Sequence, residues 1–149
     1  MADLNGQYTV TFDPKSGRLA IPARHRKGMP EDQRSELYVT RGFEQCVTAY
    51  YKDSWAEFKD KITDRKLKKI QLNALKRQFI GRMNQVAFDK QGRISLNSDL
   101  IDYAGLQQES EVIIVGCEDY LEIWSPKLYQ KYAEESEDEI QELYKKDYF

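Results

Sequence analysis

Lysine and arginine side chains gather in two similar stretches of this 149-residue chain, Phe12–Pro22 and Phe88–Leu96. Each stretch has an aromatic residue, an aspartate, a turn that contains glycine, and an arginine followed by a short apolar run. The basic side chains are Lys15 and Arg18 in the first stretch and Lys90 and Arg93 in the second. An arginine fork suits phosphate or the acceptor edge of guanine, and a lysine suits a single phosphate. Each stretch therefore predicts a hairpin whose cationic turn can bind an anionic polymer.

Each turn also contains residues that give it its shape. Asp13 and Asp89 start the turns, where a short carboxylate accepts backbone N–H bonds. Gly17 and Gly92 suit backbone angles that other residues adopt only at a cost. An arginine beside such an aspartate can simply pair with it, so this role stays open for both arginines, although the recurrence of Lys with Arg favours contact with phosphate or a base. We refer to residues 13–18 as the first basic turn and to residues 89–93 as the second basic turn.

The segment after the first stretch is also basic. Arg24, Arg26 and Lys27 extend the predicted cationic surface, with His25 among them. Because His25 is the only histidine and lies between Arg24 and Arg26, we expect neither a His-based catalytic triad nor a multi-histidine metal site. Lys15-Ser16-Gly17 resembles the end of a phosphate loop but lacks its other glycines and its helix. The sequence therefore predicts a binding protein, not an enzyme, with no metal and no cofactor.

Charge is divided unevenly along the chain. Residues 1–97 contain 19 Lys and Arg against 11 Asp and Glu, and residues 98–149 contain 4 against 14, although the whole chain has a net charge of −2. The local field attracts phosphate, so an acidic total does not argue against nucleic-acid binding. No apolar run approaches the roughly 20 residues of a membrane span, and the first residues are polar. We expect a cytoplasmic protein with no membrane partner, whose Cys46 and Cys117 are reduced.

Alternation of apolar and polar residues predicts the strands that position the two basic turns. Tyr8, Val10 and Phe12 alternate with polar residues and form the strand that enters the first basic turn. The other predicted strands are Arg18–Pro22, Leu37–Thr40, Cys46–Tyr51, Val86–Phe88, Ile94–Leu96, Glu111–Gly116 and Leu121–Trp124.

Apolar residues spaced three or four apart predict the helices. They begin at Ser54, at Thr63-Asp64 (ending at Gly81), at Ser98 (ending at Gly105) and at Ser125-Pro126. Thr63-Asp64 and Ser98 are the expected N-caps of their helices. Apolar residues cover a wide arc between Leu67 and Phe79, so this helix is expected to pack on two sides, between the halves or against another subunit. The acidic run Glu134–Glu139 indicates either a solvated helix face or a face that repels DNA.

The second half of the chain repeats the order of the first. The corresponding residues are Gly42 and Gly116, Tyr50 and Trp124, and Arg18 and Arg93. The offset is 74 residues for the first two pairs and 75 for the third. A constant offset indicates a tandem duplication. We therefore divide the chain into residues 1–82, a first repeat with a helical connection, and residues 83–149, a second repeat with the C-terminal helix.

Four short motifs occur together in this chain. They are the two Asp-to-Gly-Arg turns, Ile21-Pro22-Ala23 followed by Arg26, Thr40-Arg41-Gly42, and Leu121-Glu122-Ile123-Trp124 before a helix. Together they resemble the MraZ family, bacterial transcriptional regulators of the division and cell-wall gene cluster. The resemblance covers nearly the whole chain and implies an AbrB-like α+β fold, a β-barrel-like domain with flanking helices. It also implies a ring-shaped homo-oligomer that binds repeated promoter elements through the basic turns.

The resemblance carries specific residues over to this chain. The implied DNA contacts are Lys15 or Ser16 with Arg18, and Lys90 with Arg93. The first basic turn is one residue longer than the second and than the family's usual turn, so either Lys15 or Ser16 can fill the family's lysine position. Leu96-Asn97 stands where members of the family often have Ile-Pro.

These observations lead to one hypothesis, a sequence-specific DNA-binding repressor of that gene cluster, associated with the nucleoid. Its predicted DNA-binding residues are Lys15, Arg18, Arg24, Arg26, Lys90 and Arg93. Its expected partners are double-stranded DNA and further copies of the chain. The alternative is a structural or protein-interaction oligomer whose cationic loops bind no specific DNA. RNA is disfavoured because the turns carry no exposed aromatic residue on which a base could stack.

Overall fold

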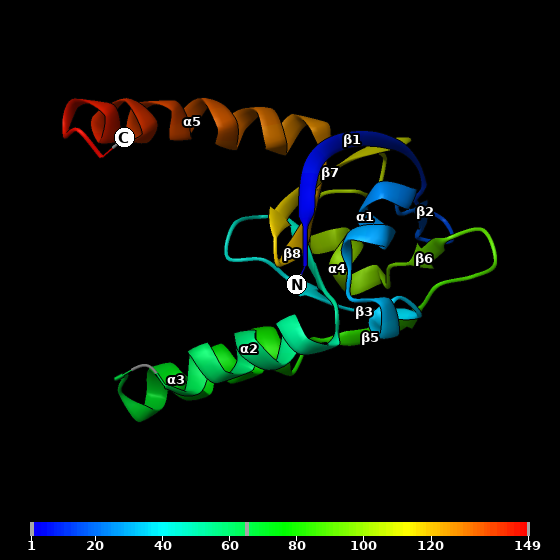
Figure 1. Cartoon of the computed structure of the whole chain (residues 1–149), viewed down its shortest axis with the longest axis horizontal. Helices are drawn as coiled ribbons and strands as arrows, with labels where there is room; N and C mark the ends of the chain where they lie inside the picture. The colour runs from blue at the N-terminus through cyan, green and yellow to red at the C-terminus, as the bar shows by residue number, and fades with distance from the viewer. Residues whose placement is uncertain (1, 65, 149) are drawn as a thin grey trace.

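Eight strands form one antiparallel sheet in the computed structural model, which describes residues 2–64 and 66–148 (Figure 1). The strands are β1 (Leu4–Asp13), β2 (Arg18–Ala20), β3 (Glu36–Arg41), β4 (Val47–Tyr50), β5 (Asn84–Ala87), β6 (Arg93–Ser95), β7 (Glu111–Glu118) and β8 (Tyr120–Trp124). Their order in the sheet is β5-β3-β4-β8-β7-β1-β2-β6. The outer strands β5 and β6 are joined by the second basic turn, where the Asp89 N–H donates to the Arg93 carbonyl at 2.9 Å. The sheet therefore nearly closes, which confirms the predicted barrel-like α+β fold.

The strands of the two halves are interleaved within this sheet. β1 pairs with β7 and β3 pairs with β5, so each half lies against a strand of the other. The halves also meet where β2 pairs with β6 and where β4 pairs with β8. In these two contacts, residues that correspond under the repeat offset pair with each other: Leu19 with Ile94 and Thr48 with Glu122. A pseudo-two-fold axis therefore relates the halves and passes through the barrel wall at both contacts.

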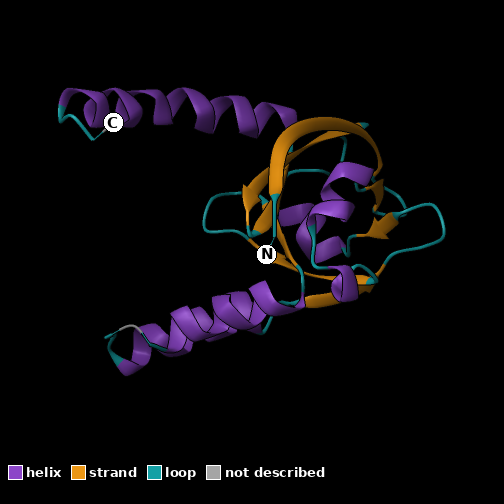
Figure 2. Ribbon diagram, in the orientation of Figure 1, coloured by secondary structure: helices purple, strands orange, loops and turns teal. Residues whose placement is uncertain are grey.

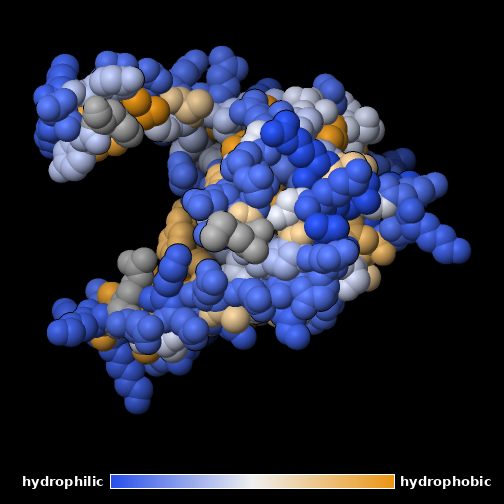
Figure 3. All heavy atoms as spheres, viewed as in Figure 1, coloured by the Kyte–Doolittle hydropathy of each residue, from blue (hydrophilic) through white to orange (hydrophobic). Residues whose placement is uncertain are grey.

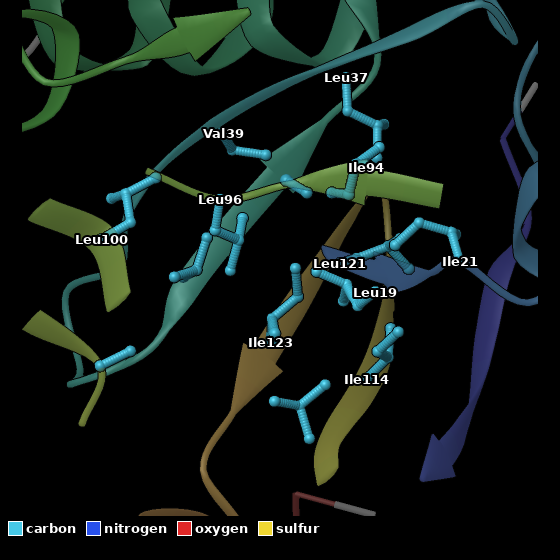
Figure 4. Packing of buried hydrophobic residues seen from close by; sticks show 14 of the residues in the cluster. Leu19, Ile21, Leu37, Val39, Ile94, Leu96, Leu100, Ile114, Leu121 and Ile123 are labelled. Carbon is cyan, nitrogen blue, oxygen red and sulfur yellow. The ribbon is translucent and has the colours of Figure 1, made fainter. Parts of the chain in front are cut away.

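The core is filled by side chains from both halves (Figure 4). Leu19 of β2 and Ile94 of β6 are almost completely buried in it. Burying a side chain of this size stabilises the fold by about 2 kcal/mol. Successive strand residues point to opposite faces, so the burial of these two residues directs their neighbours Arg18 and Arg93 away from the core.

Helices lie between and after the strands, some against the barrel and others extending beyond it (Figure 2). They are α1 (Ala23–Gly28), α2 (Lys52–Thr63), α3 (Lys69–Leu75), α4 (Ser98–Tyr103) and α5 (Pro126–Lys145), with a 3-10 helix at Glu31–Gln33 and a π-helical segment at Lys76–Ile80. The α2–α3 pair forms one arm and α5 forms another, and both point away from the connection between β5 and β6 (Figure 1). No helix within residues 2–64 and 66–148 is long and apolar enough to cross a membrane.

The second helix of the α2–α3 arm begins later than predicted. α2 continues through Thr63, whose hydroxyl donates to carbonyls of the preceding turn, so Thr63 ends one helix and does not cap the next. α3 begins at Lys69, and its π-helical extension ends at Ile80 with Gly81 as the C-cap, the stop that the sequence predicts. Within the wide apolar arc, Phe79 is buried but Ile70 is 74% exposed. The chain itself therefore covers this arc only in part.

The short helix α4 is capped by Asn97, one residue before the predicted cap Ser98. The Asn97 side-chain oxygen accepts the Leu100 N–H at 3.0 Å, and Asn97 has the extended backbone of a capping residue. The prediction of Ser98 was wrong because Ser98 is already the first helical residue.

Asn97→Ala is expected to lower the free energy of unfolding by about 1 kcal/mol, because it removes this capping bond. Ser98→Ala serves as the matched variant and is expected to change that energy by less than about 0.5 kcal/mol. Urea denaturation of both variants measures the difference. An equal loss in the two variants would show that Asn97 does not cap the helix.

The last helix begins as the sequence predicts. The Ser125 hydroxyl accepts the Leu128 N–H at 3.3 Å, and Pro126 occupies the first helical position. The carboxylates of the run Glu134–Glu139 are exposed, as a solvated helix face requires. Hydrophobic residues appear among hydrophilic ones along both arms (Figure 3).

Candidate nucleic-acid interface

The arginines of the two basic turns lie side by side on one surface of the barrel. The pairing of β2 with β6 places Arg18 opposite Ser95 and Arg93 opposite Ala20. Arg18 and Arg93 consequently line the same two hollows, one next to the first basic turn and the other next to the second. The sequence predicts two separate cationic turns, and the structure joins them into one surface.

Each turn is bound to the chain segment that returns from the other turn. The Gly17 carbonyl accepts the Leu96 N–H at 2.8 Å, and the Gly92 carbonyl accepts the Ile21 N–H at 3.0 Å. The φ angles of Gly17 and Gly92 are +72° and +74°, in the left-handed region that favours glycine. A Cβ atom at Gly17 would also lie 2.1 Å from the Leu96 carbonyl oxygen. The first basic turn therefore needs glycine both for its backbone angle and for its contact with the other half.

In the second basic turn the aspartate holds the arginine. One Asp89 carboxylate oxygen accepts the N–H groups of Gln91 at 2.8 Å and Arg93 at 2.9 Å. The other accepts the Arg93 Nε–H at 2.8 Å, which makes an ion pair. These bonds, first that from the Arg93 N–H, lower the pKa of Asp89. The Arg93 side chain is thereby fixed in one orientation, while its terminal nitrogens have no hydrogen-bond partner within the described residues.

In the first basic turn the side chain bonded to the aspartate is a serine and not the arginine. One Asp13 carboxylate oxygen accepts the Lys15 N–H at 3.0 Å, and the other accepts the Ser16 hydroxyl at 2.8 Å. The Ser16 oxygen in turn accepts the Arg18 N–H at 3.3 Å. The exposed Arg18 guanidinium has no hydrogen-bond or ion-pair partner in the part of the chain that the structure describes. The extra residue of this turn thus brings Ser16 to the aspartate and leaves Arg18 free.

Ser16→Ala is expected to raise the pKa of Asp13 toward its ordinary value, because the Ser16 hydroxyl is the main cause of its lowering. A lowered carboxyl pKa stabilises the folded turn at neutral pH, and this contribution disappears as the pH falls through the folded pKa. Titration of the carboxyl carbons by NMR measures the shift. The pKa of Asp89 in the same spectra is the internal control and is expected to stay unchanged.

The two repeats are also found when the chain is compared with known proteins. The sequence profile of the MraZ protein family matches residues 4–78 and again residues 79–146. The chain belongs to the MraZ family. This match confirms the family that the turn motifs indicate.

Curated MraZ proteins are similar to the chain over most of its length. A protein named Transcriptional regulator MraZ from Thermomicrobium roseum is 40% identical over 129 residues, which cover 87% of this chain and 86% of the relative. The protein of the same name from Treponema denticola is 36% identical to this chain over 140 residues, which cover 93% of each chain. The one from Natranaerobius thermophilus is 34% identical over 138 residues, covering 93% of this chain and 92% of the relative.

The remaining predicted site residues of this MraZ chain differ in exposure. Lys15 and Lys90 are exposed in their turns, and Arg24 is exposed on α1. Arg26 is half-buried, and its Nε–H donates to the Ile21 carbonyl at 3.0 Å. A Cβ atom at Gly92 would lie 2.7 Å from the Arg26 guanidinium carbon, so this side chain lies against the second basic turn. DNA contact remains a prediction for all six residues, and Arg26 has a structural role in addition.

His25 is a structural residue whose importance the sequence does not reveal. Its side chain is completely buried. Its Nε2 lies 3.0 Å from the Asn5 carbonyl and 3.1 Å from the Gly6 carbonyl, so Nε2 carries the hydrogen and donates to both. Its ring also meets the Tyr8 ring edge to face at 5.1 Å. His25 therefore holds α1 against β1. The sequence did not indicate this role because His25 stands among basic residues.

The remaining groups that could react or bind a metal are the cysteines and the acidic side chains. Cys46 is buried and Cys117 is half-buried, and both are free thiols, as predicted. Burial raises the pKa of Cys117 to about 11, which disfavours the reactive thiolate at neutral pH. Within residues 2–64 and 66–148, no group of three or more His, Cys, Asp or Glu side chains could hold a metal ion.

Proposed function

We propose that this chain is a sequence-specific DNA-binding transcriptional regulator that represses the division and cell-wall gene cluster by binding repeated elements in its promoter. One observation carries the proposal: the pairing of β2 with β6 sets Arg18 and Arg93 side by side on an exposed surface. The names of the three relatives support a role in transcription. The resemblance to the MraZ family supplies the gene cluster and the repressor role.

Binding divides between phosphate and base contacts. Lys15, Lys90 and Arg24 are exposed cations around the paired turns and suit phosphate contacts, which supply most of the affinity. The two arginines extend from the neighbouring strands β2 and β6, and an arginine there suits a phosphate or the acceptor edge of guanine in the major groove. Arg26 joins this surface from α1. No catalytic step belongs to this function.

Several copies of the chain act together in this proposal. A ring-shaped homo-oligomer would present many pairs of turns to repeated DNA elements, and linked contacts raise overall affinity without new ones. Exposed apolar residues on the helical arms support such an assembly: Ile70 on α3 and Ile140 and Leu143 on α5. The complex would act in the cytoplasm, at the nucleoid. Analytical ultracentrifugation tests this point, and a stable monomer at micromolar concentration would contradict it.

A gel-shift assay with the DNA upstream of the gene tests the function. We expect a retarded complex that survives an excess of unrelated competitor DNA and weakens steeply with salt, because phosphate contacts release counterions. A protein that forms oligomers yet shows no retardation would favour the alternative, an interaction module with cationic loops. The exposed apolar residues of the two arms are the observation that supports this alternative.

A further inference from the structure

The two basic turns share a backbone arrangement but hold their arginines differently. Each turn accepts a backbone N–H from the opposite half through its glycine, as the pseudo-two-fold axis requires. The Arg93 Nε is bound to Asp89 at 2.8 Å, and the Arg93 side chain is 36% exposed. In the first turn the Ser16 hydroxyl occupies the carboxylate, and Arg18 is exposed and unpaired within the described residues. One arginine is therefore fixed and the other is free.

The surroundings of the two turns differ in charge as well. Helices α1 and α4 begin 75 residues apart, at equivalent positions after β2 and β6. Under this offset Arg24 of α1 corresponds to Asp99 of α4, and Lys27 corresponds to Asp102. α1 lies against the second basic turn through Arg26, whereas α4 starts just after Leu96, which is bonded to the first basic turn. The basic side chains of α1 therefore have acidic counterparts on α4, and one of these, Asp99, forms an ion pair with Arg82 at 2.8 Å.

We infer that the two arginines divide the task of DNA binding: Arg93 discriminates between base sequences, and Arg18 adds affinity that is the same for every sequence. This inference rests on the proposed function. With its Nε bound to Asp89, Arg93 presents its two terminal nitrogens as a fork of fixed direction. A fixed fork loses little rotamer freedom on binding and fits the two acceptors of guanine in only one geometry. The free Arg18 can follow a phosphate wherever it lies.

Asp89→Asn and Asp13→Asn form a matched pair for testing this division. Both variants keep one carbonyl oxygen for the backbone of the turn, but only Asp89→Asn replaces the oxygen that holds an arginine. Fluorescence anisotropy with the promoter duplex and with a scrambled duplex gives a specificity ratio for each protein. We expect Asp89→Asn to lower this ratio by on the order of tenfold, the value of one good base contact. Asp13→Asn is expected to leave it within about twofold.

Arg93→Lys and Arg18→Lys repeat the test without touching the aspartates. A lysine keeps the charge but cannot form a two-pronged contact. We expect Arg93→Lys to lower the specificity ratio, and Arg18→Lys to change the affinities for the two duplexes by the same factor, so that its specificity ratio stays the same. Equal effects of the two lysine variants, or a larger loss of specificity at position 18, would overturn the inference. A wild-type chain that does not distinguish the two duplexes would instead contradict the proposed function, so the two failures are separable.

Discussion

Gly17→Ala is expected to lower the free energy of unfolding by about 3 kcal/mol or more. Two costs add in this variant. A φ of +72° is unfavourable for any residue with a Cβ atom, and the new Cβ would lie 2.1 Å from the Leu96 carbonyl oxygen. That oxygen belongs to the backbone directly after β6, so it can move only if the bond between Leu96 and Gly17 and the β2–β6 pairing are disturbed. Urea denaturation measures the loss.

Gly92→Ala is the matched variant in the other turn. Its φ of +74° carries a similar backbone cost, but its new Cβ would meet the flexible end of the Arg26 side chain. That end can move aside by giving up its bond to the Ile21 carbonyl, so we expect a loss of roughly 1–2 kcal/mol. If the two glycine variants lose equal stability, the close contact with the Leu96 carbonyl adds nothing to the cost of a Cβ atom at Gly17.

The double variant Arg18→Ala/Arg93→Ala is expected to lower the affinity for the promoter DNA by at least about a hundredfold, because both arginine contacts are lost. The salt dependence of binding is expected to become weaker, since fewer phosphates are neutralised. Both side chains point away from the core, so the fold is expected to survive. Anisotropy at several salt concentrations measures the first two effects, and circular dichroism checks the fold.

A second double variant controls for charge. Lys127→Ala/Lys145→Ala removes two exposed cations from α5, the arm that points away from the second basic turn (Figure 1). We expect it to bind DNA within about threefold of the wild type, because charges more than a Debye length from the contact are largely screened. A loss as large as that of the arginine pair would mean that total charge, and not the paired turns, determines binding.

Local patterns in the sequence were sufficient to predict the elements around the turns. Alternation from Tyr8 to Phe12 predicted β1, and the glycine and aspartate of each turn predicted its position. The interleaving of the two halves was not predictable, because the residues that pair β1 with β7 are far apart in the chain and their alternation fits several partners. The division at residue 82 stays a prediction about the sequence repeat.

The details of the candidate site were harder to predict than its location. The extra residue of the first basic turn was visible in the sequence, but only side-chain geometry shows that Ser16 binds Asp13 and releases Arg18. Arg26 was grouped with the exposed cations because charge alone does not reveal its contact with Gly92. Similarly, Asn97 and Ser98 are both good caps, and one residue of helix register decides between them.

The interleaved sheet sets an order of events on the ribosome. β1 is among the first strands to be synthesised, but Tyr8 pairs with Ile114, and the partner strand β7 is made much later. While translation continues, the β3–β4 hairpin can form by itself, whereas β1 has an unpaired edge that other chains could join. The nascent chain therefore cannot complete its barrel until β7 and β8, residues 111–124, have left the exit tunnel.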